Sequence, residues 1–132
     1  MKISSIRKKK LKKSKIDKLR EECGIFGISN HTDASALVAL GLHALQHRGQ
    51  EGCGIVSFDG KNYHSEKRQG LVGDHFTEIE TLKKLPGNFA IGHNRYSTTG
   101  ETSLRNIQPF FADLHMGGLS VAHNGNLTNA LL

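Results

Sequence analysis

The spacing of apolar positions changes several times along the chain, which predicts a mixture of strands and helices. Residues 23–29, CGIFGIS, form a short β-prone apolar run. Asp33 is a good helix N-cap, and from there to Gly49 apolar residues recur at helical spacing, which predicts one helix. The positions that share this spacing are Ala34, Leu37, Val38, Gly41, Leu42 and Leu45. Such a broad apolar face is typical of a helix that is buried on one side.

The remaining pattern predicts further strands and short helices. Residues 53–58 and 62–67 read as two strands that an Asp59-Gly60 turn joins into a hairpin. We also expect a loop at 68–75, a short helix at 76–84, a strand at 88–96, a loop at 97–108, a strand at 117–123 and the start of a helix in the last six residues. This order of elements predicts an α+β or layered α/β fold.

Charge divides the chain into two parts. The formal net charge is +6, but residues 1–22 carry +7 and residues 23–132 carry −1. We therefore expect a basic, disordered leader at 1–22, followed by a near-neutral folded body at 23–132. The alternative for the leader is a nucleic-acid-binding arm, but no aromatic side chain interleaves its lysines to stack on bases. We expect no nucleic-acid partner.

The composition also excludes several classes of protein. No apolar run approaches the roughly 18 residues of a membrane helix, and the leader lacks the apolar core of a secretory signal. We therefore expect a cytoplasmic protein without a membrane partner, in which Cys23 and Cys53 are free thiols. Two cysteines are too few for a four-thiolate iron–sulfur cluster, so residues 1–132 hold no complete ligand set for one.

Cys23 is the first residue that could perform chemistry. A lone thiol in a β-rich region is commonly a buried core residue, and for Cys53 we favour that interpretation. Cys23 differs because it lies where the charge changes sign, with Gly24 and Gly27 leaving room beside it. Removal of residues 1–22 would give Cys23 a free α-amine, which titrates near the thiol's own range. One residue could then supply both nucleophile and general base.

Two further motifs contain groups suited to binding and to oxyanion stabilisation. In GHNRYSTTG, residues 92–100, Arg95 lies among hydroxyl side chains and could bind a carboxylate with its planar guanidinium. A surface arginine in a turn is an equally good interpretation. In HNGN, residues 123–126, the Asn124 amide and the Gly125 N–H could point two donors at one oxyanion, although Asn-Gly is also the commonest hairpin turn.

His43 and His47 are four residues apart on the predicted helix, which raises the question of a metal site. The zinc-protease pattern requires Glu after the first histidine, and Ala44 stands there. No third ligand follows at a known spacing, so we predict no metal at this position. His47 and Arg48 are instead typical of a helix C-terminus, where positive charge is favourable.

The order and spacing of these motifs are more specific than any one of them. The relevant segments are CGIFG, LQHRGQEGCGI, GHNRYSTTG, NIQPF and AHNGNLTN. In this order they resemble the glutaminase domain of the glutamine phosphoribosylpyrophosphate amidotransferases, over about residues 17–132. Tyr96 and Gln50 favour this family over other class II amidotransferases such as glucosamine-6-phosphate synthase. The resemblance implies an N-terminal-nucleophile fold, a four-layer αββα sandwich, which we expect to be incomplete at the C-terminus.

The resemblance also implies catalytic and binding roles. Removal of residues 1–22 would expose Cys23, which would attack the side-chain amide of glutamine, form a thioester and release ammonia. Asn124 and Gly125 would form the oxyanion hole. Arg95 would hold the α-carboxylate of glutamine with Thr98 nearby, and Arg48 would position the Cys23 terminus.

We expect the chain to be the first part of a longer enzyme. That enzyme, a homo-oligomer, would pass ammonia to phosphoribosyl pyrophosphate with Mg²⁺ and form 5-phosphoribosylamine for purine synthesis. Both the phosphate substrate and Mg²⁺ would bind in a transferase domain beyond residue 132, and residues 23–132 would need no cofactor. The alternatives are the glutaminase domain of another class II amidotransferase and a non-catalytic remnant that kept the fold.

Overall fold

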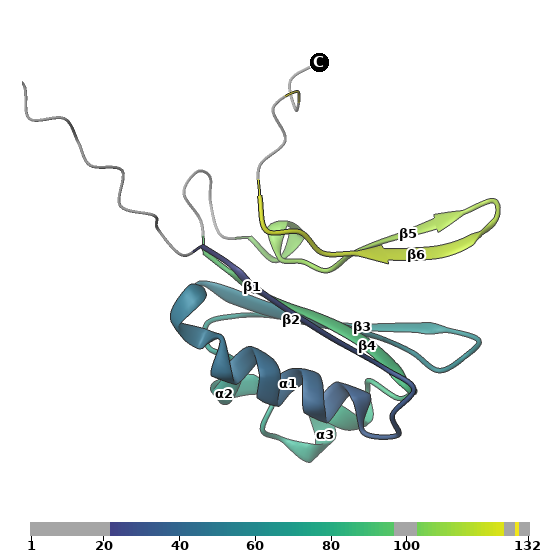
Figure 1. The fold of residues 1–132 in the computed structure, drawn as a ribbon, viewed down its shortest axis with the longest axis horizontal. Coiled ribbons are helices and arrows are strands. Elements are labelled where there is room, and N and C mark those ends of the chain that lie inside the picture. Colours follow the sequence, from purple (N-terminus) through teal and green to yellow (C-terminus); the bar gives the residue numbers. More distant parts are fainter. Residues whose placement is uncertain (1–21, 97–102, 126–128, 130–132) are drawn as a thin grey trace, which may run out of the picture.

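The computed structural model describes residues 22–96, 103–125 and 129. The described elements follow the order β1 (Gly24–Ser29), α1 (Ala34–Ala44), the 3-10 turn η1 (Gln46–Arg48), β2 (Gly52–Phe58), β3 (Tyr63–Gln69), α2 (Val72–His75), α3 (Ile79–Lys83), β4 (Phe89–Arg95), η2 (Leu104–Asn106), β5 (Phe110–Leu114) and β6 (Gly117–Val121). Figure 1 shows them as stacked layers, with α1 on one side of a sheet and the β5–β6 hairpin on the other.

The main sheet is antiparallel and has the strand order β1-β4-β2-β3. The hairpin of β2 and β3 closes at Asp59, whose carboxylate accepts the backbone N–H groups of Lys61 and Asn62 at 2.8 and 2.7 Å. An aspartate can accept the backbone N–H groups of the residues that follow it, and for this reason Asp-Gly predicts a turn. Strand β4 is inserted between β1 and β2, so the chain order and the spatial order differ.

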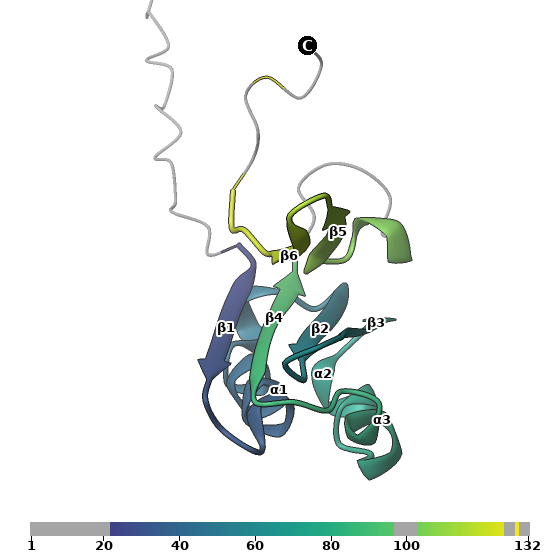
Figure 2. The same cartoon turned by 90° about the vertical axis from the view of Figure 1, so that its right-hand side faces the viewer.

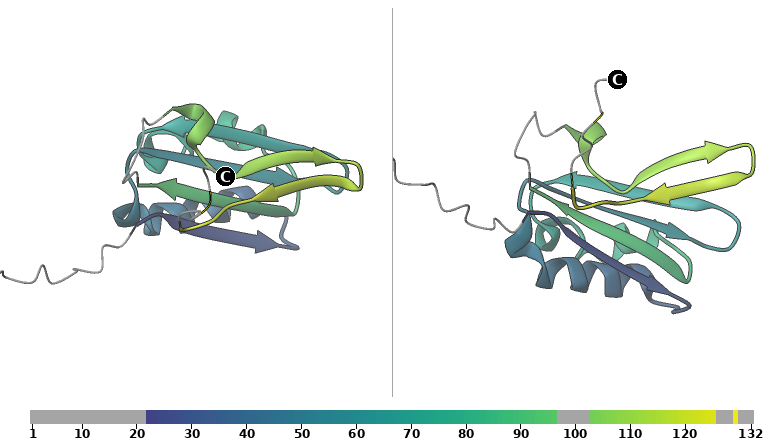
Figure 3. Two further views of the ribbon diagram at one scale, coloured as in Figure 1. Left: turned by 90° about the horizontal axis from the view of Figure 1, so that it is seen from above. Right: turned by 45° about the horizontal axis from the view of Figure 1, so that its top comes forward.

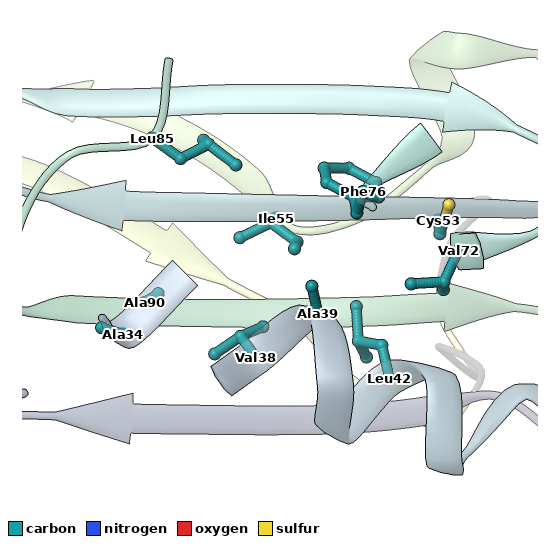
Figure 4. Close-up of a cluster of buried hydrophobic side chains, with 10 residues drawn as sticks. All are labelled: Ala34, Val38, Ala39, Leu42, Cys53, Ile55, Val72, Phe76, Leu85 and Ala90. Atoms are coloured by element: carbon teal, nitrogen blue, oxygen red, sulfur yellow. The ribbon is translucent and has the colours of Figure 1, made fainter. Parts of the chain in front are cut away.

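Helix α1 covers one face of this sheet, and the main hydrophobic core lies between them. Figure 4 shows the core side chains, which are Ala34, Val38, Ala39, Leu42, Cys53, Ile55, Val72, Phe76, Leu85 and Ala90. Glycines bring the layers close, because a Cβ on Gly92 would lie 2.6 Å from both the Val38 and the Leu42 side chains. The predicted helix face therefore packs as its spacing indicated.

The second face of the sheet is covered by the segment from η2 to β6, as Figures 2 and 3 show. Tyr63 of β3 ties the layers together, because its hydroxyl donates to the Gly118 carbonyl at 3.0 Å and its ring packs on Phe111. Helix α1 and two antiparallel sheets are three consecutive layers of the expected αββα arrangement. The fold class predicted from the sequence is confirmed as far as the described residues extend.

Four details of the predicted elements were wrong. The segment 68–75 is not a loop, because β3 continues to Gln69 and α2 follows. Strand β5 was not predicted at all. Helix α1 ends at Ala44 rather than near Gly49, although Asp33 does occupy the predicted N-cap position, without a side-chain capping hydrogen bond. The helix expected at 76–84 occupies only Ile79–Lys83. Residues 97–102 of the expected loop, most of the expected final helix and residues 1–21 of the expected leader lie outside the described residues.

No helix among the described residues is long and apolar enough to cross a membrane.

Candidate active site

Cys23 lies at the start of β1, next to the end of β4. Its φ of 56° is in the left-handed region, which non-glycine residues adopt at an energetic cost and only where their surroundings hold them. Its half-buried thiol lies 3.6 Å from the Tyr96 carbonyl and 3.5 Å from the Tyr96 backbone nitrogen, which donates to the sulfur. The backbone of Tyr96 thus holds the thiol at the end of the sheet.

Arg48 holds the backbone on both sides of the Glu22–Cys23 peptide bond. Its Nε donates to the Cys23 carbonyl at 2.7 Å, and its Nη2 lies 3.5 Å from the Glu22 carbonyl. The arginine follows α1 in η1, so the end of that helical region places the guanidinium over the start of β1. The predicted relation between Arg48 and Cys23 is therefore present as a direct contact.

Gln46 braces the turn that carries Arg48, a role that the sequence did not indicate. Its Nε2 donates to the Gly49 carbonyl at 2.5 Å, and its Oε1 accepts the Val72 backbone N–H at 2.8 Å. A Cβ on Gly49 would lie 2.6 Å from the Arg95 backbone, so glycine allows the turn to lie against the end of β4.

Arg95 ends β4 on the face that is opposite α1. Its Nη1 donates to the Asn106 carbonyl at 2.9 Å, which fixes the guanidinium against η2. Its Nε is buried and has no hydrogen-bond partner within the described residues. A buried donor without a partner is costly, so this nitrogen retains the capacity to bind an anionic oxygen. Thr98, the predicted companion of Arg95, lies outside the described residues.

Asn124 and Gly125 follow β6 and are exposed. The segment that contains them runs out on the same side of the molecule as the start of β1 and the end of β4 (Figures 1 and 2). Between described residues, no hydrogen bond links either of them to Cys23. The main-chain N–H of His123, which precedes them, donates to the Gln108 Oε1 at 2.6 Å.

The two cysteines have very different surroundings, and both are free thiols, as predicted. Cys53 is fully buried in the core beneath α1, and burial raises the pKa of its thiol to about 12. Because the thiolate is the nucleophilic form, Cys53 is a poor nucleophile at neutral pH. Its interpretation as a core residue is confirmed.

His93 is a second titratable group buried near the site. It is fully buried in β4, and neither ring nitrogen has a hydrogen-bond partner within the described part of the chain. Burial, together with the electrostatic influence of the neighbouring His123, lowers the pKa of His93 to about 4. The imidazole is therefore neutral at physiological pH. Nothing in the spacing of residues 88–96 indicated that this histidine would be buried.

Within the ranges that the structure describes, no group of three or more His, Cys, Asp or Glu side chains could hold a metal ion. His43 of α1 faces Gly73 of α2, where a Cβ would lie 3.5 Å from its ring. The described site thus consists of a thiol, two arginines and backbone donors.

The sequence profile of the glutamine amidotransferases class-II matches residues 22–131, which includes all of these groups. The chain belongs to the class II glutamine amidotransferases. The N-terminal-nucleophile fold expected for this class agrees with the layers described above, which are α1 and the two antiparallel sheets.

Two individual relatives show which enzymes within this class the chain is similar to. The chain is 65% identical over 115 residues to the amidophosphoribosyltransferase of Rhizobium etli, which covers 87% of this chain and 23% of the relative. It is 56% identical over 113 residues to the chloroplastic amidophosphoribosyltransferase 3 of Arabidopsis thaliana, which covers 86% and 21%. The class II amidotransferase chain thus spans about a fifth to a quarter of these relatives.

A solved structure supports the same relationship. The glutamine phosphoribosylpyrophosphate amidotransferase of Bacillus subtilis, complexed with ADP and GMP, superposes with a TM-score of 0.70 at 46% identity. The match covers 80% of this chain and 22% of that one. Because the identity is high and the fold agrees, the predicted family resemblance and fold class are both confirmed.

Proposed function

We propose that residues 23–132 belong to the glutamine-hydrolysing part of an amidophosphoribosyltransferase of purine synthesis. The contact of Arg48 with the carbonyl groups of Cys23 and Glu22 carries this proposal. That contact orients the backbone at the residue which must become the nucleophilic terminus. The glutamine phosphoribosylpyrophosphate amidotransferase similarity supports the assignment to purine synthesis.

Maturation is the first proposed step. Hydrolysis of the Glu22–Cys23 peptide bond would remove residues 1–22 and leave Cys23 with a free α-amine. A protein α-amine has a pKa near 7.7–8.0, so roughly a tenth to a sixth of it is unprotonated at pH 7. It can therefore accept the thiol proton, and no separate histidine is needed.

The hydrolysis of glutamine then takes two stages. The Cys23 sulfur attacks the side-chain amide carbon, and the α-amine takes the thiol proton. The tetrahedral intermediate places its negative oxygen at the Asn124 amide and the Gly125 N–H. Collapse of the intermediate breaks the C–N bond, the amine returns the proton to the leaving nitrogen, and ammonia departs. Water then attacks the thioester, which releases glutamate and regenerates the thiol.

Arg95 is proposed to bind the α-carboxylate of glutamine. The unpartnered Nε supports this role, because the guanidinium is already held at Nη1 and loses little freedom when it binds. Thr98 would assist from the loop that follows β4, and Arg48 would keep the Cys23 terminus in place.

We propose that ammonia is used by phosphoribosyl pyrophosphate elsewhere in a longer protein, where Mg²⁺ would assist. The hydrolysis of glutamine proposed for residues 23–132 requires no such ion. The two free thiols support a reducing compartment such as the cytoplasm. The name of the Arabidopsis relative shows that a plastid is another compartment that such proteins occupy.

Selective labelling tests the nucleophile. A diazo-ketone analogue of glutamine should label Cys23 of the full-length enzyme and spare Cys53, and excess glutamine should slow the reaction. Cys53→Ser should label like the wild type, and Cys23→Ser should not label. Equal labelling of both cysteines, or labelling of Cys53 alone, would contradict the proposal.

Mass spectrometry of the purified full-length enzyme tests maturation. The active species should begin at Cys23. An active enzyme that retains residues 1–22 would exclude the free-amine mechanism. A Cys23→Ala precursor provides the matched control for the mass of the unprocessed chain.

A further inference from the structure

The second face of the main sheet has a gap in its side chains at β2. Gly52 and Gly54 point toward the layer that contains β5 and β6, and β4 places Arg95 and His93 directly across from them. A Cβ on Gly54 would collide with the Gln108 carbonyl oxygen, and a Cβ on Gly52 would lie 2.6 Å from Ile107. The backbone before β5 therefore lies directly on the sheet.

Gln108 is buried in this contact, with 6% of its surface exposed. Its backbone lies on Gly54, while its side-chain Oε1 accepts the main-chain N–H of His123 at 2.6 Å. The side chain thus connects two chain segments that are 15 residues apart. One end of the connection is fixed to the sheet, and the other holds the residue immediately before Asn124.

The length and chemistry of the Gln108 side chain suit this position. The amide oxygen is an uncharged acceptor, so it satisfies the His123 N–H without placing a charge beside the buried His93 ring. A hydrogen bond of 2.6 Å leaves little freedom in the height of His123 above the sheet. Oxyanion donors act only when they meet the developing charge within tenths of an ångström.

We propose that Gln108 is a positioning residue for the oxyanion turn: by holding His123 to the sheet at Gly54, it sets the place of the Asn124 and Gly125 donors. This inference rests on the proposed function, because it assigns Asn124 and Gly125 to the oxyanion. In this role Gln108 acts through the His123 backbone and not by binding the substrate itself. Its effect is expected on the transition state, and not on glutamine binding or on the thiol.

Gln108→Met in the full-length enzyme removes the acceptor and keeps the shape of the side chain. We expect kcat for glutamine hydrolysis to fall roughly ten- to hundredfold, with KM within about threefold of the wild type. The rate at which iodoacetamide alkylates Cys23 should change by less than about twofold, because that reaction needs no oxyanion hole. Gln108→Glu keeps an acceptor oxygen but adds a charge at a buried position, so it should recover only part of the lost kcat.

Tyr63→Phe is the matched control. It removes another hydrogen bond between the same two layers, from the Tyr63 hydroxyl to the Gly118 carbonyl, away from the turn. Its kcat should stay within about twofold of the wild type. An unchanged kcat in Gln108→Met, an equal loss in Tyr63→Phe, or a parallel loss of Cys23 alkylation would overturn the inference.

Hydrogen exchange separates this inference from the proposed function. The His123 amide should exchange at least about tenfold faster in Gln108→Met than in the wild type, while the Ile55 amide in the core stays unchanged. This readout needs no activity. If the wild-type enzyme does not hydrolyse glutamine, the proposed function fails. If the His123 amide exchanges at the same rate in Gln108→Met as in the wild type, the anchoring role of Gln108 fails, whatever the activity. If Gln108→Met does not fold, Gln108→Asn decides by the same two measurements, because its shorter side chain withdraws the acceptor from the His123 N–H. A kcat and a His123 exchange rate equal to those of Tyr63→Phe would overturn the role.

Discussion

The two faces of the main sheet are built from the same four strands but from different chemistry. Toward α1, β2 and β4 present Cys53, Ile55 and Ala90, and the contact is apolar and closely packed. Toward β5 and β6, the same strands present glycines beside His93 and Arg95. Each face contains buried polar atoms without partners among the described residues: Ser57 Oγ and Asn94 Oδ1 toward α1, and the His93 ring and Arg95 Nε on the second face. The difference is that the first face is otherwise an apolar core, whereas the second places a histidine and an arginine beside glycines.

Truncation on the α1 face should give the largest loss of stability. Leu42→Ala removes a fully buried side chain that packs over Gly92. We expect the free energy of unfolding to fall by roughly 4 kcal/mol, from lost burial and from the cavity. Urea unfolding measures it. Leu40→Gln, an exposed position on the same helix, should change the value by less than about 0.5 kcal/mol. Similar losses at both positions would mean that α1 does not pack as described.

Acid should weaken the second face through His93. The pKa of about 4 in the folded protein lies below the ordinary value of 6.5, so the unfolded chain binds more protons between these values. The contribution of His93 is complete above about pH 6.5 and is lost as the pH falls to about 4, up to about 3 kcal/mol in total. Urea unfolding should show that the free energy of unfolding rises with pH across this range. The slope should be smaller in His93→Gln and unchanged in His43→Gln, the control at an exposed position. An unchanged slope in His93→Gln would assign the acid sensitivity to other groups.

Filling the gap on the second face should impair turnover more than stability. Gly54→Ala places a Cβ against the Gln108 carbonyl and pushes the second layer outward. We expect a loss of about 2 kcal/mol in unfolding free energy and a fall of more than about tenfold in glutamine turnover by the folded enzyme. Gly73→Ala is the control, because its Cβ would meet only ordinary contacts at 3.5 Å. If turnover falls only in proportion to the amount of folded enzyme, then the second face has no special effect on turnover and the comparison fails.

A single buried hydrogen bond should give the smallest of these effects. Ser35 of α1 is buried and donates to the Leu85 carbonyl at 2.7 Å. Ser35→Ala should cost about 1 kcal/mol of unfolding free energy and leave turnover unchanged. The Ser120 hydroxyl makes a similar bond to the Phe110 carbonyl but is exposed, so Ser120→Ala should cost less. The reverse order, measured by urea unfolding, would contradict the burial described for the two faces.

Much of the first face could be predicted from the sequence, because apolar spacing records burial directly. The spacing of Val38 and Leu42 predicted α1, and the apolar run around Ile55 predicted β2. Strand β5 could not be found, because all five of its residues are exposed and they do not alternate. Helix α2 is only four residues long, and its first N–H is satisfied by the distant Gln46 side chain.

The site shows the same division. Cys23, Arg48 and Arg95 were predicted because their motifs resemble those of a known family, and the described contacts bring Cys23 and Arg48 together. Gln46 and Gln108 were not predicted to have any role. Each acts by meeting backbone from a different part of the chain, and no local spacing records such a meeting. Three-dimensional structure is needed to find residues of this kind.

The first half of strand β2 has no side chains on one face and has side chains on the other, because Gly52 and Gly54 alternate with Cys53 and Ile55. A slip of one residue in its pairing with β4 would turn the two glycines toward α1 and the two bulky residues toward Ile107 and Gln108. The core would then be hollow, and the second layer could not close. Only one register allows both layers to form, so the glycines that admit the second layer also select against misfolded pairings of the sheet.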